Sequence, residues 1–207
     1  MNIEIWHINK PPRQSSPFFL QHILAHTLNI PANLVNIARG EFGKPYLVDV
    51  PECQFNLSHS NEKMVIAVGF NVDIGIDIEA IKPRRNLDGL VKKCFSPIEQ
   101  TYWQSLSEDQ KMTLFYEFWT RKEALVKAIG RGIAIGLQNC EINVANQNDF
   151  LHLPHGDESN WHTHLFDTQQ RNYCGAIAVN QNHVTFHHNN WVNYFPLITL
   201  PYCIDYV

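Results

Sequence analysis

The stretch from Phe115 to Gly132, FYEFWTRKEALVKAIGRG, constrains the fold most, because it predicts a long helix that carries charged groups. No proline interrupts it, and Gly130 and Gly132 supply a stop. Glu123 and Lys127 are four residues apart, so both side chains emerge on one face. A lone pair at this spacing is more often an ordinary surface ion pair, and its meaning depends on what lies opposite. The apolar residues at helical spacing are Phe115, Phe118, Trp119, Ala124, Leu125 and Ala128.

The segment from Ile74 to Glu79 alternates isoleucines with other residues, which is typical of a strand with one buried face. Asp77 and Glu79 therefore project from the same side, where two carboxylates repel each other unless a cation or a proton lies between them. With Glu123 added from the helix, three hard oxygen donors would be available. We therefore predict a Mg²⁺ site on Asp77, Glu79 and Glu123, with positions left for water and substrate phosphate.

Four ordered motifs carry a family resemblance: EFGKPYL at 41–47, NLSHS at 56–60, GIDIE at 75–79 and FWTRKEALVKAIGRG at 118–132. Together they resemble the signature of the 4′-phosphopantetheinyl transferases, and more closely the long single-chain class called the Sfp type. The resemblance covers roughly residues 40 to 132. It implies an α+β fold of two similar α/β halves related by a pseudo-twofold, with the active site in the cleft between them. We expect the halves to be residues 1–72 and 73–207.

The resemblance also implies a reaction. The enzyme would transfer the 4′-phosphopantetheine group of coenzyme A to a serine hydroxyl of an apo acyl or peptidyl carrier protein. The transfer would depend on Mg²⁺ and release adenosine 3′,5′-bisphosphate. The predicted catalytic residues are Asp77, Glu123 and Lys127. The alternative is a non-catalytic module of the same fold that binds coenzyme A and carrier proteins, and a Mg²⁺-dependent nucleotide hydrolase is disfavoured because no GxxxxGK[ST] loop is present.

Coenzyme A contacts are predicted on both sides of the acidic strand. The glycine-rich turn that holds Arg39 and Lys44 can present backbone N–H groups and cations to phosphate, although a plain hairpin loop would look the same. By resemblance, Lys44 contacts the nucleotide, and Ser58 and His59 line the pocket. Lys127 is one helical turn from Glu123 and is placed to contact the same phosphates.

The N-terminal segment departs from the family, which usually carries several arginines and lysines there for the 3′-phosphate. Either phosphate binding is weaker at this end, or Arg39, His59 and another histidine compensate. The polar and cationic residues that this segment offers are Lys10, Arg13, Gln21, His22 and His26.

A locally basic set follows the acidic strand and is interleaved with Leu90 and Phe95. Such a run usually marks a solvated helix face. It would also suit docking of an acidic helical partner, with an apolar centre and a cationic rim. Carrier proteins are partners of this kind, so we favour docking. The basic residues are Arg84, Arg85, Lys92 and Lys93.

Composition narrows the setting. The net charge of −4 gives no reason to expect nucleic-acid binding. The opening segment does not resemble a signal peptide, and no apolar run reaches membrane-spanning length. Five cysteines without CxxC spacing fit reduced thiols, so we expect a cytoplasmic protein without membrane contacts. A monomer suffices, because one chain supplies both sides of the cleft.

The last third is predicted to be strand-rich, and its aromatic tail from Trp191 to Val207 is predicted to pack across the second half. His162, His164, His187 and His188 are interpreted as solvated strand residues rather than zinc ligands, because they lack the spacing of a zinc site. The predicted strands span 138–145, 150–154, 161–168, 173–179 and 183–187.

Overall fold

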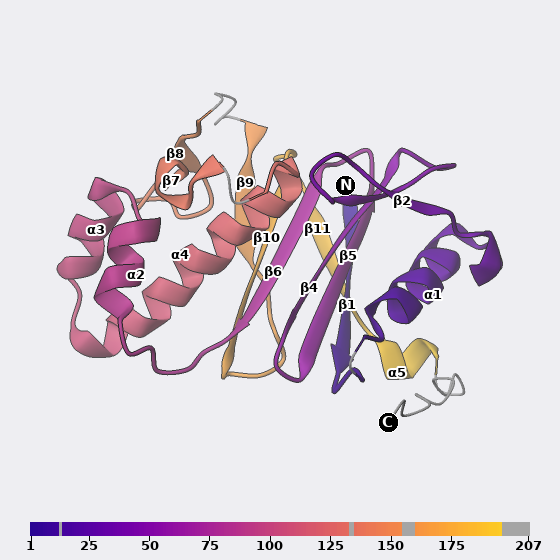
Figure 1. Ribbon diagram of the computed structural model, residues 1–207, viewed down its shortest axis with the longest axis horizontal. Helices are drawn as coiled ribbons and strands as arrows, with labels where there is room; N and C mark the ends of the chain where they lie inside the picture. The colour runs from indigo at the N-terminus through magenta and orange to yellow at the C-terminus, as the bar shows by residue number, and fades with distance from the viewer. Residues whose placement is uncertain (13, 133–134, 155–159, 196–207) are drawn as a thin grey trace.

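The computed structural model describes residues 1–12, 14–132, 135–154 and 160–195 (Figure 1). One connectivity occurs twice along it: a strand, a long helix, and then two more strands, the last of which pairs antiparallel with the first. The first unit comprises β1 (Asn2–Asn9), α1 (Ser16–Leu28), β4 (Cys53–Ser60) and β5 (Lys63–Phe70), in the sheet order β1-β5-β4. The second comprises β6 (Ile74–Ala80), α4 (Glu108–Ile129), β9 (His162–Leu165) and β10 (Tyr173–Val179), in the order β6-β10-β9.

This repeated topology confirms the predicted α+β fold of two similar halves. In the first half Trp6 of β1 lies opposite Ile66 of β5, and in the second Asp77 of β6 lies opposite Ala176 of β10. Ile74, Ile76 and Ile78 are buried as predicted, but the expectation of a single buried face is wrong, because Gly75 and Asp77 on the other face are buried as well. The other face of β6, which carries Asp77 and Glu79, turns toward α4.

The C-terminal part of the chain returns to the first half. Strand β11 (Thr185–Asn190) pairs parallel with β1, so the first sheet is completed from the far end of the sequence (Figure 1). The predicted division into residues 1–72 and 73–207 therefore remains a prediction, and β11, from the second of these ranges, pairs with a strand of the first. The predicted packing of the tail on the second half is wrong where it can be followed, because Trp191 and Phe195 belong to the core of α1 and β1. Residues 196–207 lie outside the described residues.

Short elements connect the main ones. In the first half these are η1 (Ala32–Leu34), β2 (Ile37–Arg39) and β3 (Pro45–Leu47), and α5 (Trp191–Tyr194) follows β11. In the second half they are α2 (Leu87–Cys94), α3 (Pro97–Gln104), η3 (Leu137–Asn139), β7 (Glu141–Ile142) and β8 (Phe150–His152).

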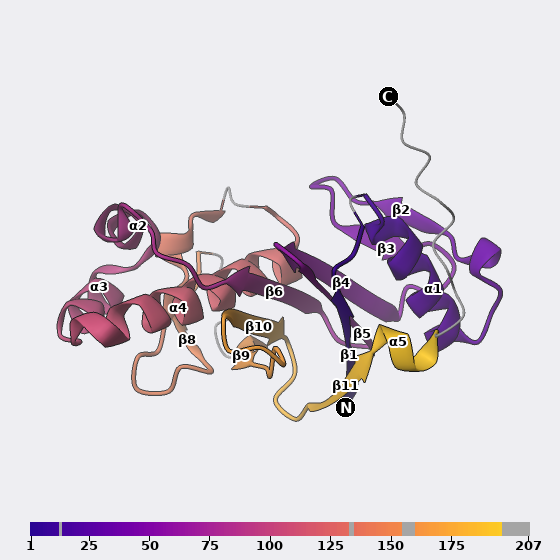
Figure 2. The same ribbon diagram turned by 90° about the horizontal axis from the view of Figure 1, so that it is seen from below.

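Helix α4 lies directly against β6 and β10 (Figure 2). Gly75 makes this approach possible, because a Cβ there would lie 1.9 Å from the carbonyl oxygen of Ala124. The helix ends at Gly130, whose φ of 74° is the left-handed conformation that glycine adopts without strain. The predicted helix is thus confirmed, and its start lies further upstream, at Glu108. Among the described residues, no helix is long and apolar enough to cross a membrane.

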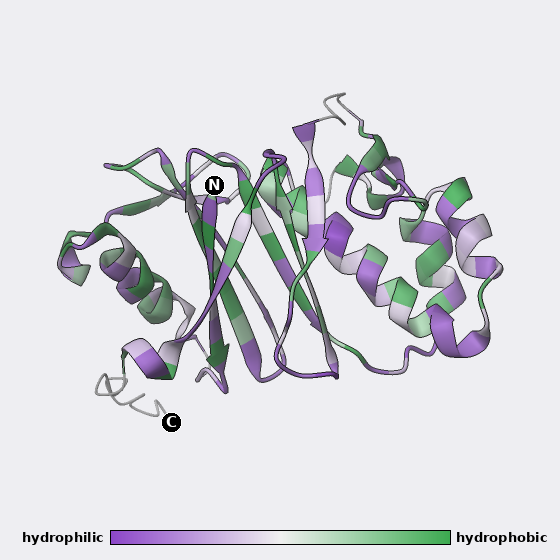
Figure 3. Cartoon of the chain, turned by 180° about the vertical axis from the view of Figure 1, so that it is seen from behind, coloured by the Kyte–Doolittle hydropathy of each residue, from purple (hydrophilic) through white to green (hydrophobic). Residues whose placement is uncertain are grey.

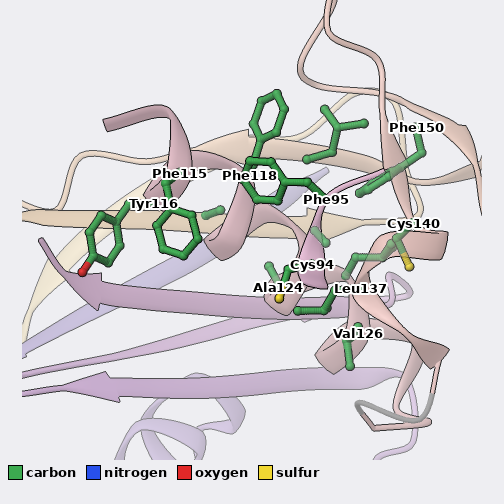
Figure 4. Packing of buried hydrophobic residues seen from close by; sticks show 14 of the residues in the cluster. Cys94, Phe95, Phe115, Tyr116, Phe118, Ala124, Val126, Leu137, Cys140 and Phe150 are labelled. Carbon is green, nitrogen blue, oxygen red and sulfur yellow. The ribbon is translucent and has the colours of Figure 1, made fainter. Parts of the chain in front are cut away.

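The hydrophobic core of the second half contains aromatic rings of α4 and of the segments that pack against it (Figure 4). Phe95 is fully buried there, with its ring stacked on that of Phe115 at 5.8 Å between centroids. The expectation that Phe95 provides an exposed apolar centre for docking is therefore wrong. In Figure 3 much of the hydrophobic colour lies on the central strands, as burial of their side chains requires.

The predicted strand at 138–145 is mostly wrong. The turn of η3 and the two residues of β7 occupy this stretch. The carbonyl of Leu137 accepts a hydrogen bond from Lys122, and the N–H of Ile142 donates to Glu99. Side chains thus satisfy backbone groups that a longer strand would have paired. The other predicted strands are present, and several are shorter than expected.

Candidate active site

A cleft of about 940 Å³ lies between the two halves. Helix α1, the segment around β2 and strand β4 form one wall, and β6 and α4 form the other. The predicted residues that line it are Arg39, Ser58, His59, Asp77, Glu79, Glu123 and Lys127. Ser16, Pro17, Leu20, Gln21, Val35, Asn36, Ile37, Pro45, Leu57 and Trp119 complete the lining.

Lys127 joins the two walls. Its Nζ donates to Asp77 Oδ1 at 2.7 Å, to the carbonyl of Ile76 at 3.2 Å and to Ser58 Oγ at 2.8 Å. The hydroxyl of Ser58 in turn donates to Asp77 Oδ1 at 2.8 Å. A single hydrogen-bonded group therefore joins Ser58 of β4, Ile76 and Asp77 of β6, and Lys127 of α4. Ser58, predicted as a coenzyme A contact, has its hydroxyl engaged in this group.

Two carboxylates of the cleft, Asp77 and Glu123, have raised pKa values. Burial raises the pKa of Glu123 to about 7, and the charges of Asp77 and Glu79 add to the rise while Lys127 opposes it. Burial also raises the pKa of Asp77, against the effects of Lys127 and Ser58. The charges of Asp77 and Glu79 both raise the proton affinity of Glu123, so a cation beside these carboxylates would be favoured.

The donor set fits a hard divalent cation. Asp77 Oδ2 is buried and has no hydrogen-bond partner among the described residues, so one carboxylate oxygen is left for a ligand. Glu79 and Glu123 line the same cleft and supply the oxygen donors that Mg²⁺ prefers. Within the part of the chain that the structure describes, however, no three acidic, histidine or cysteine side chains are gathered closely enough to hold a metal. The three-carboxylate site therefore remains a prediction.

The remaining three residues predicted to contact coenzyme A, Arg39, Lys44 and His59, differ in their surroundings. Arg39 and His59 are exposed side chains of its lining, and Arg39 Nη1 donates to the carbonyl of Gly43 at 2.9 Å. Lys44 is not part of the lining. Its Nζ donates to the carbonyl of Ala128 at 2.7 Å, and burial lowers its pKa. Its predicted contact with coenzyme A remains a prediction, and the structure gives it a place at the end of α4.

From the sequence, Trp119 is expected only as part of the apolar stripe of the helix. In the structure it lines the cleft. Its indole Nε1 is buried and has no hydrogen-bond partner among the described residues. Its position four residues before Glu123, on the same helical face, was the signal that could have identified it.

The N-terminal helix contributes less charge than its histidines suggested. Gln21 lines the cleft, and its Nε2 donates to the carbonyl of Ala32 at 2.8 Å. His22 and His26 instead pack against aromatic residues near α5, at ring distances of 6.3 Å to Trp191 and 5.3 Å to Tyr194.

Comparisons with known proteins agree with these motifs. A family model described as the 4′-phosphopantetheinyl transferase superfamily matches residues 73–178. A 4′-phosphopantetheinyl transferase of Bacillus subtilis is 37% identical over 119 residues, which are 57% of this chain and 52% of the relative. A Synechocystis sp. protein, named as a candidate 4′-phosphopantetheinyl transferase, is 33% identical over 84% of this chain and 73% of its own length.

Among solved structures, the holo-[acyl-carrier-protein] synthase of Thermotoga maritima is 16% identical, with a TM-score of 0.43 over 54% of this chain and 64% of that one. The first two curated relatives are matched over about half of their length, at 52% and 50%. The family model covers half of the chain, and the second half that it matches contains the acidic strand and α4. The chain therefore belongs to the 4′-phosphopantetheinyl transferase superfamily.

Proposed function

We propose that this protein transfers the 4′-phosphopantetheine group of coenzyme A to a serine hydroxyl of an apo acyl or peptidyl carrier protein, with release of adenosine 3′,5′-bisphosphate. One observation carries the proposal: Lys127, Asp77 and Glu123 meet in a cleft that both halves line. Transfer of this kind depends mainly on alignment of the reacting groups and on stabilisation of phosphate charge.

Asp77, Glu79 and Glu123 are the residues proposed to hold Mg²⁺. When bound, the ion would neutralise the diphosphate and stabilise the leaving group. Two observations support this assignment: Asp77 Oδ2 is buried without a hydrogen-bond partner among the described residues, and the pKa of Glu123 is raised even though Lys127 lies nearby.

Lys127 is proposed to bind the diphosphate. The Lys127 side chain is 29% exposed, and three acceptors from β4 and β6 hold its ammonium in place. A cation fixed in this way loses little further freedom when a phosphate oxygen approaches it.

Glu123 is proposed to take the proton of the attacking serine, directly or through a water molecule. A carboxylate at the edge of the metal site is the nearest base, and a bound cation would favour its ionised form. The nucleotide is proposed to occupy the end of the cleft near Arg39 and His59, where the lining also offers apolar surface from Leu57 and Ile37.

Carrier-protein docking is proposed for the basic surface after β6. Arg85, Lys92 and Lys93 are exposed, whereas Arg84 is partly buried and donates to the hydroxyl of Tyr116 at 3.0 Å. Since Phe95 is buried, this surface would act through its positive charge. Because one chain lines both walls of the cleft, we propose that the enzyme acts as a monomer. We also propose that it is cytoplasmic.

The test is intact-mass spectrometry of an apo carrier protein incubated with this protein, coenzyme A and Mg²⁺. A gain of one phosphopantetheine is expected, and it should be lost when Mg²⁺ is omitted or when Asp77→Ala replaces the wild type. Binding of coenzyme A without any mass gain on several unrelated carriers would contradict the proposal and would indicate a non-catalytic binding module.

A further inference from the structure

Strands β4 and β6 belong to different sheets, and side chains of β4 connect them. Asn56, Ser58 and Ser60 alternate along β4, so all three point to the same side. Asn56 Oδ1 accepts from the N–H of Ile76 at 3.1 Å, and Ser60 Oγ accepts from the N–H of Ala80 at 3.0 Å. These bonds replace part of the backbone ladder that two neighbouring strands would otherwise share.

Ser60 makes a second bond that Asn56 does not have. Its hydroxyl donates to Glu79 Oε2 at 3.0 Å. A serine hydroxyl has one proton, and the bond from Ala80 occupies one of its lone pairs, so the remaining hydrogen is directed toward the carboxylate. The backbone N–H of Ala80 in β6 thereby orients Ser60, and Ser60 orients the carboxylate of Glu79, which is also in β6.

We propose that Ser60 is a positioning residue that fixes the carboxylate of Glu79 for cation binding in the cleft. The inference rests on the proposed function, in which Glu79 is a metal ligand. Hydrogen bonds to ligating carboxylates commonly set ligand orientation, and their removal typically weakens metal affinity by 10–100-fold. Glu79 is partly exposed, and three side-chain torsions separate its carboxylate from the backbone, so without this bond it would sample several orientations.

Ser58 has a different role from its neighbour on the strand. Its hydroxyl donates to Asp77 and accepts from Lys127, so it already belongs to the group in the cleft. Among the described residues, the hydroxyl of Ser60 instead bonds to the carboxylate of Glu79 and the backbone of Ala80. Its effect can therefore be separated from that of Lys127.

The experiment measures Mn²⁺ affinity by the loss of the free-ion EPR signal, with coenzyme A present and no carrier protein, so that no turnover is involved. Ser60→Ala is expected to weaken Mn²⁺ binding about tenfold. Ser60→Thr keeps the hydroxyl and should bind within about twofold of the wild type. Asn56→Ala removes a comparable bond between β4 and β6, and it should lower the melting temperature without a similar loss of Mn²⁺ affinity.

A double mutant completes the test. If Ser60 acts through Glu79, Ser60→Ala should cause no further loss in a Glu79→Gln background. Equal Mn²⁺ affinities of the wild type and Ser60→Ala would overturn the inference and leave the proposed function standing. An equal loss in Asn56→Ala would assign the effect to the strand junction. Absence of Mn²⁺ binding to the wild type would refute the proposed metal site itself, and the inference with it.

Discussion

Two lysines of α4, five residues apart, form ion pairs of opposite character. Lys122 and Glu99 are fully buried, with an Nζ–Oε2 distance of 2.6 Å, and Nζ also donates to the carbonyls of Cys94 and Leu137. Lys127 and Asp77 face the cleft, at 2.7 Å, and the lysine side chain is 29% exposed. Each lysine has three protein acceptors, so the two differ in exposure and not in the number of their hydrogen bonds.

The carboxylates differ in how completely they are hydrogen-bonded. Glu99 accepts from the backbone N–H groups of Ser96 and Ile142 in addition to Lys122, so both of its oxygens are satisfied. Asp77 retains one buried oxygen without a partner among the described residues. A pair that is complete in itself holds elements together, and a pair that leaves an acceptor open can bind something else. We therefore interpret Lys122–Glu99 as structural and Lys127–Asp77 as functional.

The largest expected effect is on stability and comes from Lys122→Met. It leaves Glu99 buried without its counter-charge, which should cost about 3–5 kcal/mol in the free energy of unfolding. Urea denaturation measures this loss. Adding Glu99→Gln should restore part of it, because the buried charge is then removed. If Lys122→Met is as stable as the wild type, the structural interpretation of this pair is wrong.

Lys127→Met should show the reverse pattern. Loss of a cation aimed at the reacting phosphates should reduce kcat about 10²–10³-fold. The free energy of unfolding should fall by only about 1–2 kcal/mol, because Asp77 can take up a proton when its partner is removed. Turnover and urea denaturation of the same preparation measure both effects. A stability loss as large as that of Lys122→Met would remove the distinction between the two pairs.

Glu123→Gln should make the pH dependence of stability visible. The folded-state pKa of Glu123, about 7, lies above its ordinary value of 4.5, so the native protein binds the extra proton between these pH values. The free energy of unfolding of the wild type should therefore fall as pH rises from 4.5 to about 7. The variant lacks this titrating group and should lack this part of the fall. Without divalent cations, Glu123→Gln should melt higher than the wild type at pH 8, with the difference vanishing below about pH 4.5. A constant difference across this range would contradict the assignment.

The smallest expected effect concerns a third lysine that contacts α4. Lys44→Met removes a cationic donor from the C-terminal turn, which should cost about 0.5–1 kcal/mol of stability. The KM for coenzyme A should change little. Arg39→Met, at the cleft lining, should raise that KM with little change in stability. A KM that rises only in Lys44→Met would restore the role expected for Lys44 from the resemblance.

The sequence predicted the local parts of this site well. The period of two in Ile74–Glu79 set Asp77 and Glu79 on one side, and the period of 3.6 in α4 set Glu123 and Lys127 on one face. Both periods follow from backbone geometry within a few residues. The predictions for Phe95 and for 138–145 are wrong because distant residues set their environment: Phe95 stacks on Phe115 of α4, and Ile142 donates to Glu99, 43 residues earlier.

The sequence by itself therefore determined the composition of the site and the direction of each side chain within its own element. Only the tertiary structure decided which elements meet. Gly75 lets α4 approach β6, Lys44 is drawn to the end of α4, and β11 returns to pair with β1. These choices arise from packing and from the pairing of buried polar groups between distant segments, and no local period of the sequence records them.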